Sequence, residues 1–339
     1  MANPSTFFII LTNQCNLNCM HCYANKDGKV MTPEVLQLAN DYVVNNINDT
    51  NEEEYVVGYT GGEIGFYNQD EILKSVQYIK DKCKGKNIRF SYQTNLIYNL
   101  TTKHIEVLNQ MNEIGTSYDL FIRYKDINEY NLWVHNLKAL QEAYSDVTLR
   151  VSTVVTKYVT ELPPESLIRF YKDNNIHTVE LLNVMKSLND RNTSYLMPSN
   201  EQLRDWLYET FKIYEKVRRT YDLTIVDFEY VRQSFNSFFV NNYSRECCQK
   251  NRCITPDGKV GTCMLTQNNP IYDLVKMKEL EPLETLCNNE AVRPNICKDC
   301  EYFKYCRGGC QFYNFDETGC TTPYKIYNYL QLEQELYNE

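Results

Sequence analysis

The chain has 339 residues, 43% of them apolar, and a formal net charge of −9. This length predicts one large domain plus a smaller one, or two domains of middling size. An acidic chain gains nothing from neutralising phosphates, which argues against nucleic acid as the main partner. No run of about 18 apolar residues could span a membrane, and residues 1–6 lack the basic flank of a signal peptide. We therefore expect a cytoplasmic protein without a membrane partner.

From residue 6 to residue 184, short runs of β-branched and aromatic residues alternate with amphipathic helices. Thr32 is the expected N-cap of the first helix and Pro33 its first residue. This alternation predicts an α/β fold with a parallel sheet and right-handed crossovers, either open or closed into an incomplete barrel. In both forms the chemistry belongs at the C-terminal ends of the strands. The expected strands are 6–12, 54–59, 88–94, 118–124, 148–156 and 178–184.

Further along the chain, we expect a helix over 199–219, a strand over 223–228 and a last helix over 324–337. After about residue 245 periodicity fades, and Cys, Gly, Pro and Asn dominate. We therefore predict three regions: 1–230, 231–323 and 324–339.

Cysteine is the unusual residue, with 14 in the chain. Disulfides are disfavoured in a reducing compartment, so clustered cysteines there indicate metal sites. They fall into one group within residues 15–22 and another within 247–320. Cys83 stands apart on an apolar helical stripe, where we expect a buried core thiol.

The first group is Cys15-x3-Cys19-x2-Cys22, directly after the first expected strand. Three thiolates on one loop do not complete a tetrahedral zinc site. They can hold three irons of a [4Fe–4S] cluster and leave the fourth iron open. The alternative is a structural zinc site that a distant residue completes.

A second motif, Gly61-Gly62-Glu63, follows the second expected strand. Adjacent glycines permit close backbone approach to a ligand, although they also form ordinary turns.

Together, these two motifs resemble those of the radical S-adenosylmethionine (SAM) superfamily. Its hallmark is C-x3-C-x-aromatic-C after the first strand, and His21 occupies the aromatic slot here. Its GGE motif, matched by Gly61, Gly62 and Glu63, meets the methionine amino group of the cofactor. The resemblance covers about residues 6–185 and implies a partial (β/α)6 TIM-like barrel that binds S-adenosyl-L-methionine.

The resemblance also suggests weaker candidates for cofactor binding. Thr94 and Asn95 end the third expected strand, and Leu96 stands where many members have Gly. Arg123 ends the fourth, where a Ser commonly helps to bind the cofactor. Ser152, with Arg150, lies in the fifth and could face the ribose or carboxylate. Each could equally be a packed or surface strand residue.

The second cysteine group has the spacing C-x9-G-x4-C, then C-x2-C-x5-C-x3-C, then a last Cys. This spacing resembles the SPASM extension of radical SAM enzymes and implies two auxiliary [4Fe–4S] clusters, three in all. One would take Cys263, Cys310 and two of Cys247, Cys248 and Cys253. The other would take Cys297, Cys300, Cys306 and Cys320. Cys287 fits neither set and is expected to be structural. One or two structural zinc sites are the alternative.

The resemblance implies reductive cleavage of the cofactor to a 5′-deoxyadenosyl radical that abstracts a hydrogen atom, with auxiliary clusters accepting the remaining electron. Members with this extension mostly modify peptides or proteins. We expect a maturase that installs an oxidative crosslink, such as a thioether or C–C bond, in a ribosomally made precursor peptide. A flavodoxin or ferredoxin would donate electrons. The first strand begins by residue 6, so a leader-binding domain is not expected before it, and a separate protein could supply that function.

Other readings remain open at this point. Sulfatase-maturating members have an Asp directly after the Cys that matches Cys263, and Met264 stands here, which counts against formylglycine formation. Oxidation of a small molecule is a second enzymatic alternative. A structural zinc protein and an iron–sulfur electron carrier are the alternatives from other classes.

Overall fold

The computed structural model describes residues 5–120, 122–185, 193–237, 250–267, 269–280, 297–310, 316 and 319–338. The chain forms two compact units, each built from several segments. Unit 1 comprises Met1–Ser117, Arg123–Leu149 and Cys248–Thr285, and unit 2 comprises Tyr118–Ile122, Arg150–Cys247 and Leu286–Glu339. Among the described residues, no helix is long and apolar enough to cross a membrane.

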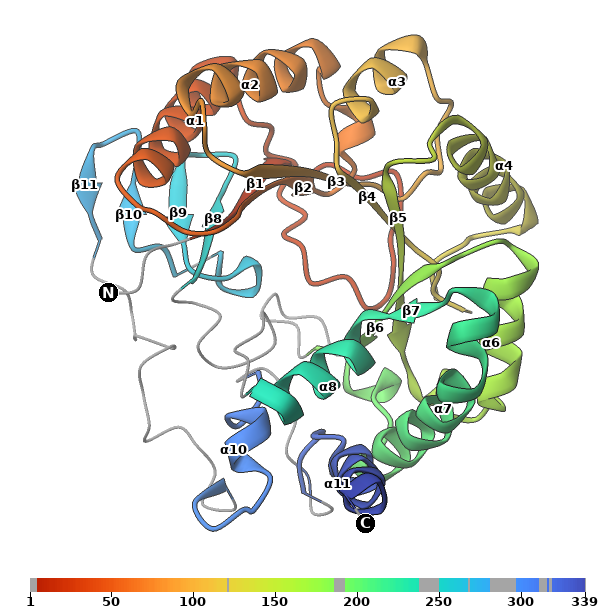
Figure 1. Ribbon diagram of the computed structural model, residues 1–339. Helices are drawn as coiled ribbons and strands as arrows, with labels where there is room; N and C mark the ends of the chain where they lie inside the picture. The colour runs from red at the N-terminus through yellow and green to blue at the C-terminus, as the bar shows by residue number, and fades with distance from the viewer. Residues whose placement is uncertain are drawn as a thin grey trace. The chain divides into compact units, whose positions relative to one another are not determined.

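The sheet of unit 1 has the strand order β11-β10-β9-β8-β1-β2-β3-β4 (Figure 1). The strands β1 to β4 are parallel and appear in chain order, and β8 runs parallel to β1 on its other side. The hairpin strands β9, β10 and β11 continue the sheet in antiparallel fashion. The strand bounds are β1 Thr6–Thr12, β2 Tyr55–Gly61, β3 Ile88–Gln93, β4 Glu113–Ser117, β8 Asn251–Ile254, β9 Lys259–Gly261, β10 Tyr272–Asp273 and β11 Lys278–Glu279.

Four helices cover the outer face of β1 to β4 in unit 1 (Figure 1). They are α1 (Pro33–Asn48), α2 (Gln69–Lys82), α3 (Thr102–Leu108) and α4 (Ile127–Ala143). Thr32 caps α1 by accepting a hydrogen bond from the Val35 amide, and Pro33 is the first helical residue, as expected. Phe7, Ile9 and Ile10 of β1 are all buried, so the strand has apolar contacts on both faces.

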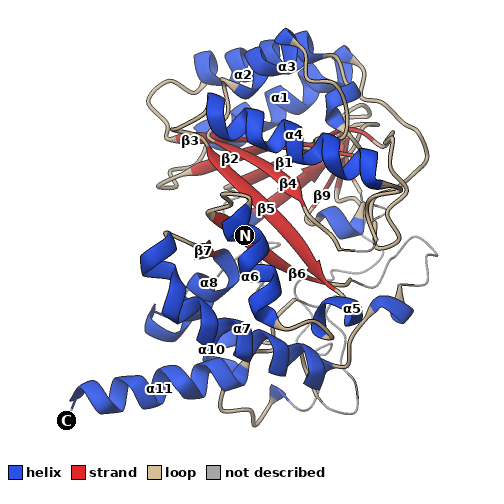
Figure 2. Ribbon diagram, turned by 90° about the vertical axis from the view of Figure 1, so that its right-hand side faces the viewer, coloured by secondary structure: helices blue, strands red, loops and turns tan. Residues whose placement is uncertain are grey.

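Unit 2 contains three parallel strands and a group of helices. The strand β5 (Thr148–Val155) begins in unit 1 and continues into unit 2, where it pairs with β6 (Thr178–Asn183), which pairs with β7 (Thr224–Ile225). The long helix α7 runs beside α6 and α11 (Figure 2). The helices are α5 Lys157–Thr160, α6 Pro164–Asp173, α7 Asn200–Tyr221, α8 Val226–Ser237, α10 Phe303–Cys306 and α11 Tyr324–Asn338.

The predicted α/β class with a partial barrel order is confirmed, because parallel strands alternate with helices along the chain. The described strands do not close into a complete barrel. The predicted division into regions 1–230, 231–323 and 324–339 stays a prediction.

Two expected strands are wrong. The fourth strand occupies Glu113–Ser117 instead of 118–124. Residues 118–124 are aromatic-rich in sequence, but the buried Asp119 side chain accepts a hydrogen bond from the Val154 amide, and the described residues of this segment form no strand. The expected strand 223–228 ends after Ile225, and α8 begins at Val226. A tertiary contact thus overrides β-propensity at the first of these two places.

Candidate active site

The loop that carries the first cysteine group leaves β1 and returns beside it. Thr12 forms an antiparallel bridge with Val30, and the Met31 amide donates to the Leu11 carbonyl over 2.8 Å. The Lys26 ammonium crosses the loop to the Leu17 carbonyl over 2.7 Å. These contacts fix both ends of the loop at the C-terminal end of β1, where a parallel sheet places its chemistry.

Cys15, Cys19 and Cys22 all lie on this loop, with Cys19 buried and the other two half-buried. Burial raises the pKa of the Cys15 thiol, and the nearby Glu63 carboxylate and Cys22 raise it further. The Leu17 amide and Lys26 oppose this shift. In the described part of the chain, no group of three or more His, Cys, Asp or Glu side chains is arranged around a single ion.

The sulfur atoms of three cysteines accept a hydrogen bond from the amide two residues later. Such contacts stabilise a thiolate, and thiolates are the ligands of iron–sulfur clusters. The donor–sulfur distance is 3.4 Å in each case, from Leu17 to Cys15, from Leu265 to Cys263 and from Gly308 to Cys306. The same local geometry therefore recurs in the loop after β1 and in both cysteine-rich segments.

Gly61 and Gly62 let the end of β2 approach the root of the cysteine loop. Gly61 has φ +150°, and a Cβ on it would lie 2.2 Å from the Thr12 carbonyl oxygen. A Cβ on Gly62 would lie 2.1 Å from the Gln14 carbonyl oxygen. The amide of Gly62 donates to Thr12 over 2.7 Å. The two glycines, which were expected to approach a ligand, thus pack against the backbone of the cysteine loop itself.

Glu63 is fully buried and accepts three hydrogen bonds. Its Oε1 accepts from the Gly65 amide over 2.7 Å and from the Thr94 hydroxyl over 2.8 Å, and its Oε2 accepts from the Asn95 amide over 2.5 Å. Burial raises the pKa of Glu63 to about 7, against these donors and the charge of Arg123. A carboxylate has about four acceptor positions, so these three hydrogen bonds do not use all of them.

Asn95 connects the end of β3 to the cysteine loop. Its Nδ2 donates to Asn16 Oδ1 over 2.7 Å and lies 3.8 Å from Cys15 Sγ. The Asn16 amide group in turn donates to the Ile97 carbonyl over 2.7 Å. Leu96, which stands in place of the family's Gly, adopts φ +57° and is buried. The backbone here keeps the left-handed conformation that glycine adopts more easily.

A different residue ends the fourth strand from the one that the sequence predicted. Ser117 ends β4, so the residue type that the resemblance implies at that place is present, although the sequence analysis assigned the place to Arg123. Arg123 lies in the connection after β4, and its charge opposes the rise in the pKa of Glu63. The predicted contact of Arg123 with a cofactor stays a prediction, as does that of His21.

Ser152 lies in unit 2 on β5 and takes part in a polar group that the sequence did not reveal. Its hydroxyl donates to Glu180 Oε2 over 2.8 Å, and Arg150 forms an ion pair with the same oxygen at 3.2 Å. Asp227 lies close by, fully buried, and accepts from the Leu181 amide over 2.6 Å. Burial, followed by the charge of Glu180, raises the pKa of Asp227 to about 8. Glu180 pairs in register with Ser152, and this strand pairing is the only signal that could have found it.

The described C-terminal cysteines occur in both units, and no disulfide joins them. In unit 1, Cys253 is buried in β8, and its pKa is raised by burial and by nearby Cys263. Cys247, Cys248 and Cys287 lie outside the described residues. Cys83 is buried at the end of α2, which confirms the expected core thiol.

In unit 2, Cys306 ends the short helix α10. Burial raises its pKa, and nearby Cys320 and Cys300 add to the rise. These are three of the four cysteines that the SPASM resemblance assigns to one cluster. The fourth, Cys297, and the remaining Cys310 are also half-buried in this unit.

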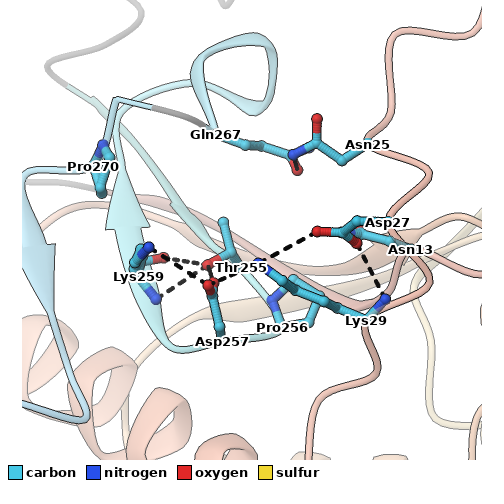
Figure 3. Close-up of a pocket in the computed structure, with 10 residues that line it drawn as sticks. All are labelled: Asn13, Asn25, Asp27, Lys29, Thr255, Pro256, Asp257, Lys259, Gln267 and Pro270. Carbon is cyan, nitrogen blue, oxygen red and sulfur yellow. Dashed lines mark hydrogen bonds and ion pairs between the residues drawn. The ribbon is translucent and has the colours of Figure 1, made fainter. Parts of the chain in front are cut away.

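A small polar pocket of about 150 Å³ lies in unit 1, where the cysteine loop meets the turn between β8 and β9. Figure 3 shows Lys29 between the carboxylates of Asp27 and Asp257, with ion-pair distances of 3.3 and 3.0 Å. Asn13 donates to Asp27 over 2.7 Å. The pocket's charges are therefore paired with one another, and its contacts join the cysteine loop to the segment that carries Cys253 and Cys263.

Comparison with known protein families and sequences supports an iron–sulfur site. Residues 5–123 match a family model described as a 4Fe-4S single cluster domain. The chain is 24% identical to the cysteine-type anaerobic sulfatase-maturating enzyme of Clostridium novyi, over 88% of this chain and 86% of that one. It is 35% identical to the uncharacterized protein MJ0907 of Methanocaldococcus jannaschii, over 32% of this chain and only 36% of that protein.

Solved structures share the fold across nearly the whole chain. The enzyme anSMEcpe with bound AdoMet superposes with a TM-score of 0.77 and 17% identity, over 99% of this chain and 100% of that one. SuiB of Streptococcus suis superposes with a TM-score of 0.59 and 18% identity, over 91% of this chain and 73% of that one. The fold expected from the two N-terminal motifs is thus the fold that these proteins have.

Proposed function

We propose that this chain is a radical SAM enzyme, which would use a [4Fe–4S] cluster and S-adenosylmethionine, and that it oxidatively modifies a ribosomally made peptide. The product would carry a new crosslink, such as a thioether or C–C bond. SuiB, which shares the fold, has been solved with its precursor peptide SuiA, and this supports a peptide as the substrate.

One observation carries the proposal: three strand ends of unit 1 meet at the cysteine loop. The loop follows β1, Glu63 follows β2, and Asn95 follows β3. The amide of Glu63 donates to the Gln14 carbonyl over 2.7 Å, and Asn95 reaches Cys15 through its side chain. Residues far apart in sequence thus combine thiols, a buried carboxylate and an amide in one place.

The residues present fit the implied groups. Thiols with amide donors aimed at sulfur suit iron, and a cluster bound there supplies the electron that cleaves SAM. The buried carboxylate of Glu63 suits the cationic amino group of methionine. Because the pKa of Glu63 is about 7, it carries its charge fully only above that pH. The three donors on Glu63 hold its carboxylate in one orientation before any ligand arrives.

Thiols in the C-terminal segments supply the proposed route for the electron left on the substrate. Cys300, Cys306 and Cys320 lie near one another in unit 2, and Cys253 lies near Cys263 in unit 1. We propose that these groups contribute to two auxiliary clusters, in addition to the catalytic one.

Anaerobic reconstitution with iron and sulfide tests the proposal. We expect a brown protein with roughly a dozen irons, from three four-iron clusters, that converts SAM to 5′-deoxyadenosine under reducing conditions. The triple variant C15A/C19A/C22A should lose about a third of the iron and all SAM cleavage. Cys83→Ala is the matched control and should keep both, because Cys83 is a buried core residue at the end of α2 and belongs to neither cysteine group. Bound zinc, or SAM cleavage in the triple variant, would refute the assignment.

Sulfatase maturation is a second candidate, favoured by the relative that matches along most of the chain. Met264, which begins the short helix after Cys263, stands where those enzymes have an Asp, and this favours the crosslinking reaction. Mass spectrometry separates the two. Incubation with a precursor peptide from a neighbouring reading frame should remove two hydrogen atoms per crosslink. Conversion of a sulfatase-type cysteine peptide to its formylglycine form, with no change in the precursor, would select the second candidate.

A further inference from the structure

The hydroxyl of Thr94, beside the buried Glu63 of unit 1, takes part in three hydrogen bonds. It donates to Glu63 Oε1 over 2.8 Å and accepts from the Leu96 amide over 3.1 Å. The hydroxyl oxygen of Tyr98 lies 3.1 Å from the same Thr94 oxygen. A threonine hydroxyl has one proton and two acceptor positions, and an ionised carboxylate only accepts. Because Thr94 gives its proton to the ionised Glu63, Tyr98 must be the donor to Thr94.

Tyr98 is buried and held in place by two helices of unit 1. Asn136 of α4 donates to the Tyr98 carbonyl over 2.8 Å, and the ring of His104 on α3 lies 5.0 Å from the Tyr98 ring, measured between centroids. On its other contact the Tyr98 ring fills the space that Gly65 leaves, since a Cβ on Gly65 would lie 2.3 Å from the ring carbon that bears the hydroxyl. The hydroxyl of Tyr98 is therefore directed at Thr94 by packing that does not depend on the hydroxyl itself.

Both donors to Glu63 Oε1 are neighbours of Tyr98. One is the Thr94 hydroxyl, and the other is the Gly65 amide, which donates over 2.7 Å. The carbonyl of Gly65 in turn accepts from His104 Nε2 over 2.8 Å, since a carbonyl oxygen can only accept. Packing of the Tyr98 ring thus supports one donor, and the Tyr98 hydroxyl supports the other. Replacing Tyr98 by phenylalanine would keep the packing and remove only the hydrogen bond to Thr94.

Hydrogen bonds in a chain polarise one another, so a donor to Thr94 strengthens the bond that Thr94 gives to an anionic carboxylate. We propose that Tyr98 is a positioning residue that acts through Thr94 to hold the ionised carboxylate of Glu63 in place for the α-amino group of S-adenosylmethionine. Tyr98 thereby raises the affinity for the cofactor without binding it. The inference rests on the proposed function, because it requires that Glu63 binds this amino group.

Calorimetric titration of SAM into the reconstituted full chain tests this role, without a reductant so that the cofactor is not consumed. In Tyr98→Phe we expect the dissociation constant for SAM to rise by about three- to tenfold, the range for loss of one hydrogen bond, with the iron content unchanged. A double-mutant cycle then tests the route. Thr94→Val breaks the chain itself and should weaken SAM binding. Adding Tyr98→Phe to Thr94→Val should cause no further rise, because Tyr98 acts only through the Thr94 hydroxyl.

Tyr59→Phe is the matched control. Tyr59 is buried in β2, and its hydroxyl lies 2.7 Å from Ser75 Oγ, so this variant also loses a buried hydrogen bond in unit 1. It should keep the dissociation constant of the parent. An unchanged constant in Tyr98→Phe, an equal rise in Tyr59→Phe, or the full rise repeated in the Thr94→Val background would overturn the inference. Loss of iron in Tyr98→Phe would also overturn it, by showing that the residue holds the loop and not the carboxylate. If the reconstituted parent does not bind SAM, the proposed function itself fails, and this inference fails with it.

Discussion

Replacing Gly62 by alanine tests whether the cysteine loop and the end of β2 are packed backbone against backbone. The new Cβ would lie 2.1 Å from the Gln14 carbonyl oxygen, 2.6 Å from the carbonyl carbon and 3.0 Å from the Asn13 carbonyl carbon. These are backbone atoms, so no side chain can rotate away and the loop must shift. Overpacking of this kind costs about 1–3 kcal/mol. Loss of the hydrogen bond from Glu63 to Gln14 adds about 1 kcal/mol, so we expect about 2–4 kcal/mol in all.

Urea unfolding measures this cost, and iron analysis after reconstitution measures its effect on the loop. Gly85→Ala is the matched control, because Gly85 has φ +86° but open space around its Cβ position. It should cost about 1–2 kcal/mol from backbone conformation alone and keep its full iron content. Gly62→Ala should unfold more easily and bind less iron. If Gly62→Ala is no less stable than Gly85→Ala and binds the full complement, the close packing does not constrain the loop.

Leu96→Gly should relieve about 1–2 kcal/mol of left-handed backbone strain but lose about 3–5 kcal/mol of buried leucine contacts. Calorimetry should therefore show a net loss of stability, and a rise in melting temperature would refute this expectation. Burial raises the pKa of Asp227 to about 8 in the folded chain, compared with about 4 in the unfolded chain. The stability that the neutral acid contributes is therefore complete below pH ~4 and is lost as the pH rises to about 8. Asp227→Asn keeps an oxygen for the Leu181 amide, and its free energy of unfolding should gain most over the parent at pH ~8; parallel profiles would contradict this. Asp257→Asn breaks an ion pair with half-exposed Lys29 and should cost no more than about 1 kcal/mol in urea, while a loss of several kcal/mol would show that the pair matters structurally.

Much of the fold could be predicted because its signals are local. The first strand is Thr6–Thr12 as expected, and the Thr32–Pro33 start of α1 is confirmed by the cap itself. The last helix, expected over 324–337, is Tyr324–Asn338. In these segments, apolar periodicity, capping and burial agree with one another.

The fourth strand could not be predicted, because it is only five residues long, includes Glu and Gly, which are depleted in strands, and is stabilised by distant partners. Thr116 accepts a hydrogen bond from the Trp133 indole over 3.0 Å, and Ile114 is buried. The expected strand 118–124 has the better strand composition, yet its Asp119 side chain accepts a hydrogen bond from the Val154 amide. A polar residue within an aromatic run needs a hydrogen-bond partner when it is buried, and strand composition alone does not take this into account.

Some residues of the candidate site could be predicted from local motifs, and others could not. The cysteines, the two glycines and Glu63 follow from short motifs. The hydrogen bonds that Asn16 and Asn95 make depend on partners that are distant in sequence, and no spacing rule predicts them. Glu180 belongs with Ser152 only because β5 and β6 pair in a particular register.

The placement of β1 between β2 and β8 has a consequence for biosynthesis. Thr6 pairs with Asn251, so the strand from which the cysteine loop departs has one open edge until the last quarter of the chain begins to leave the ribosome. At about 5–20 residues per second, that interval lasts on the order of ten seconds or more. A nascent chain arrested before residue 250 would present a buried-type apolar strand to solvent, which is a template for aggregation. Chaperone dependence during translation should therefore fall once that late segment has emerged.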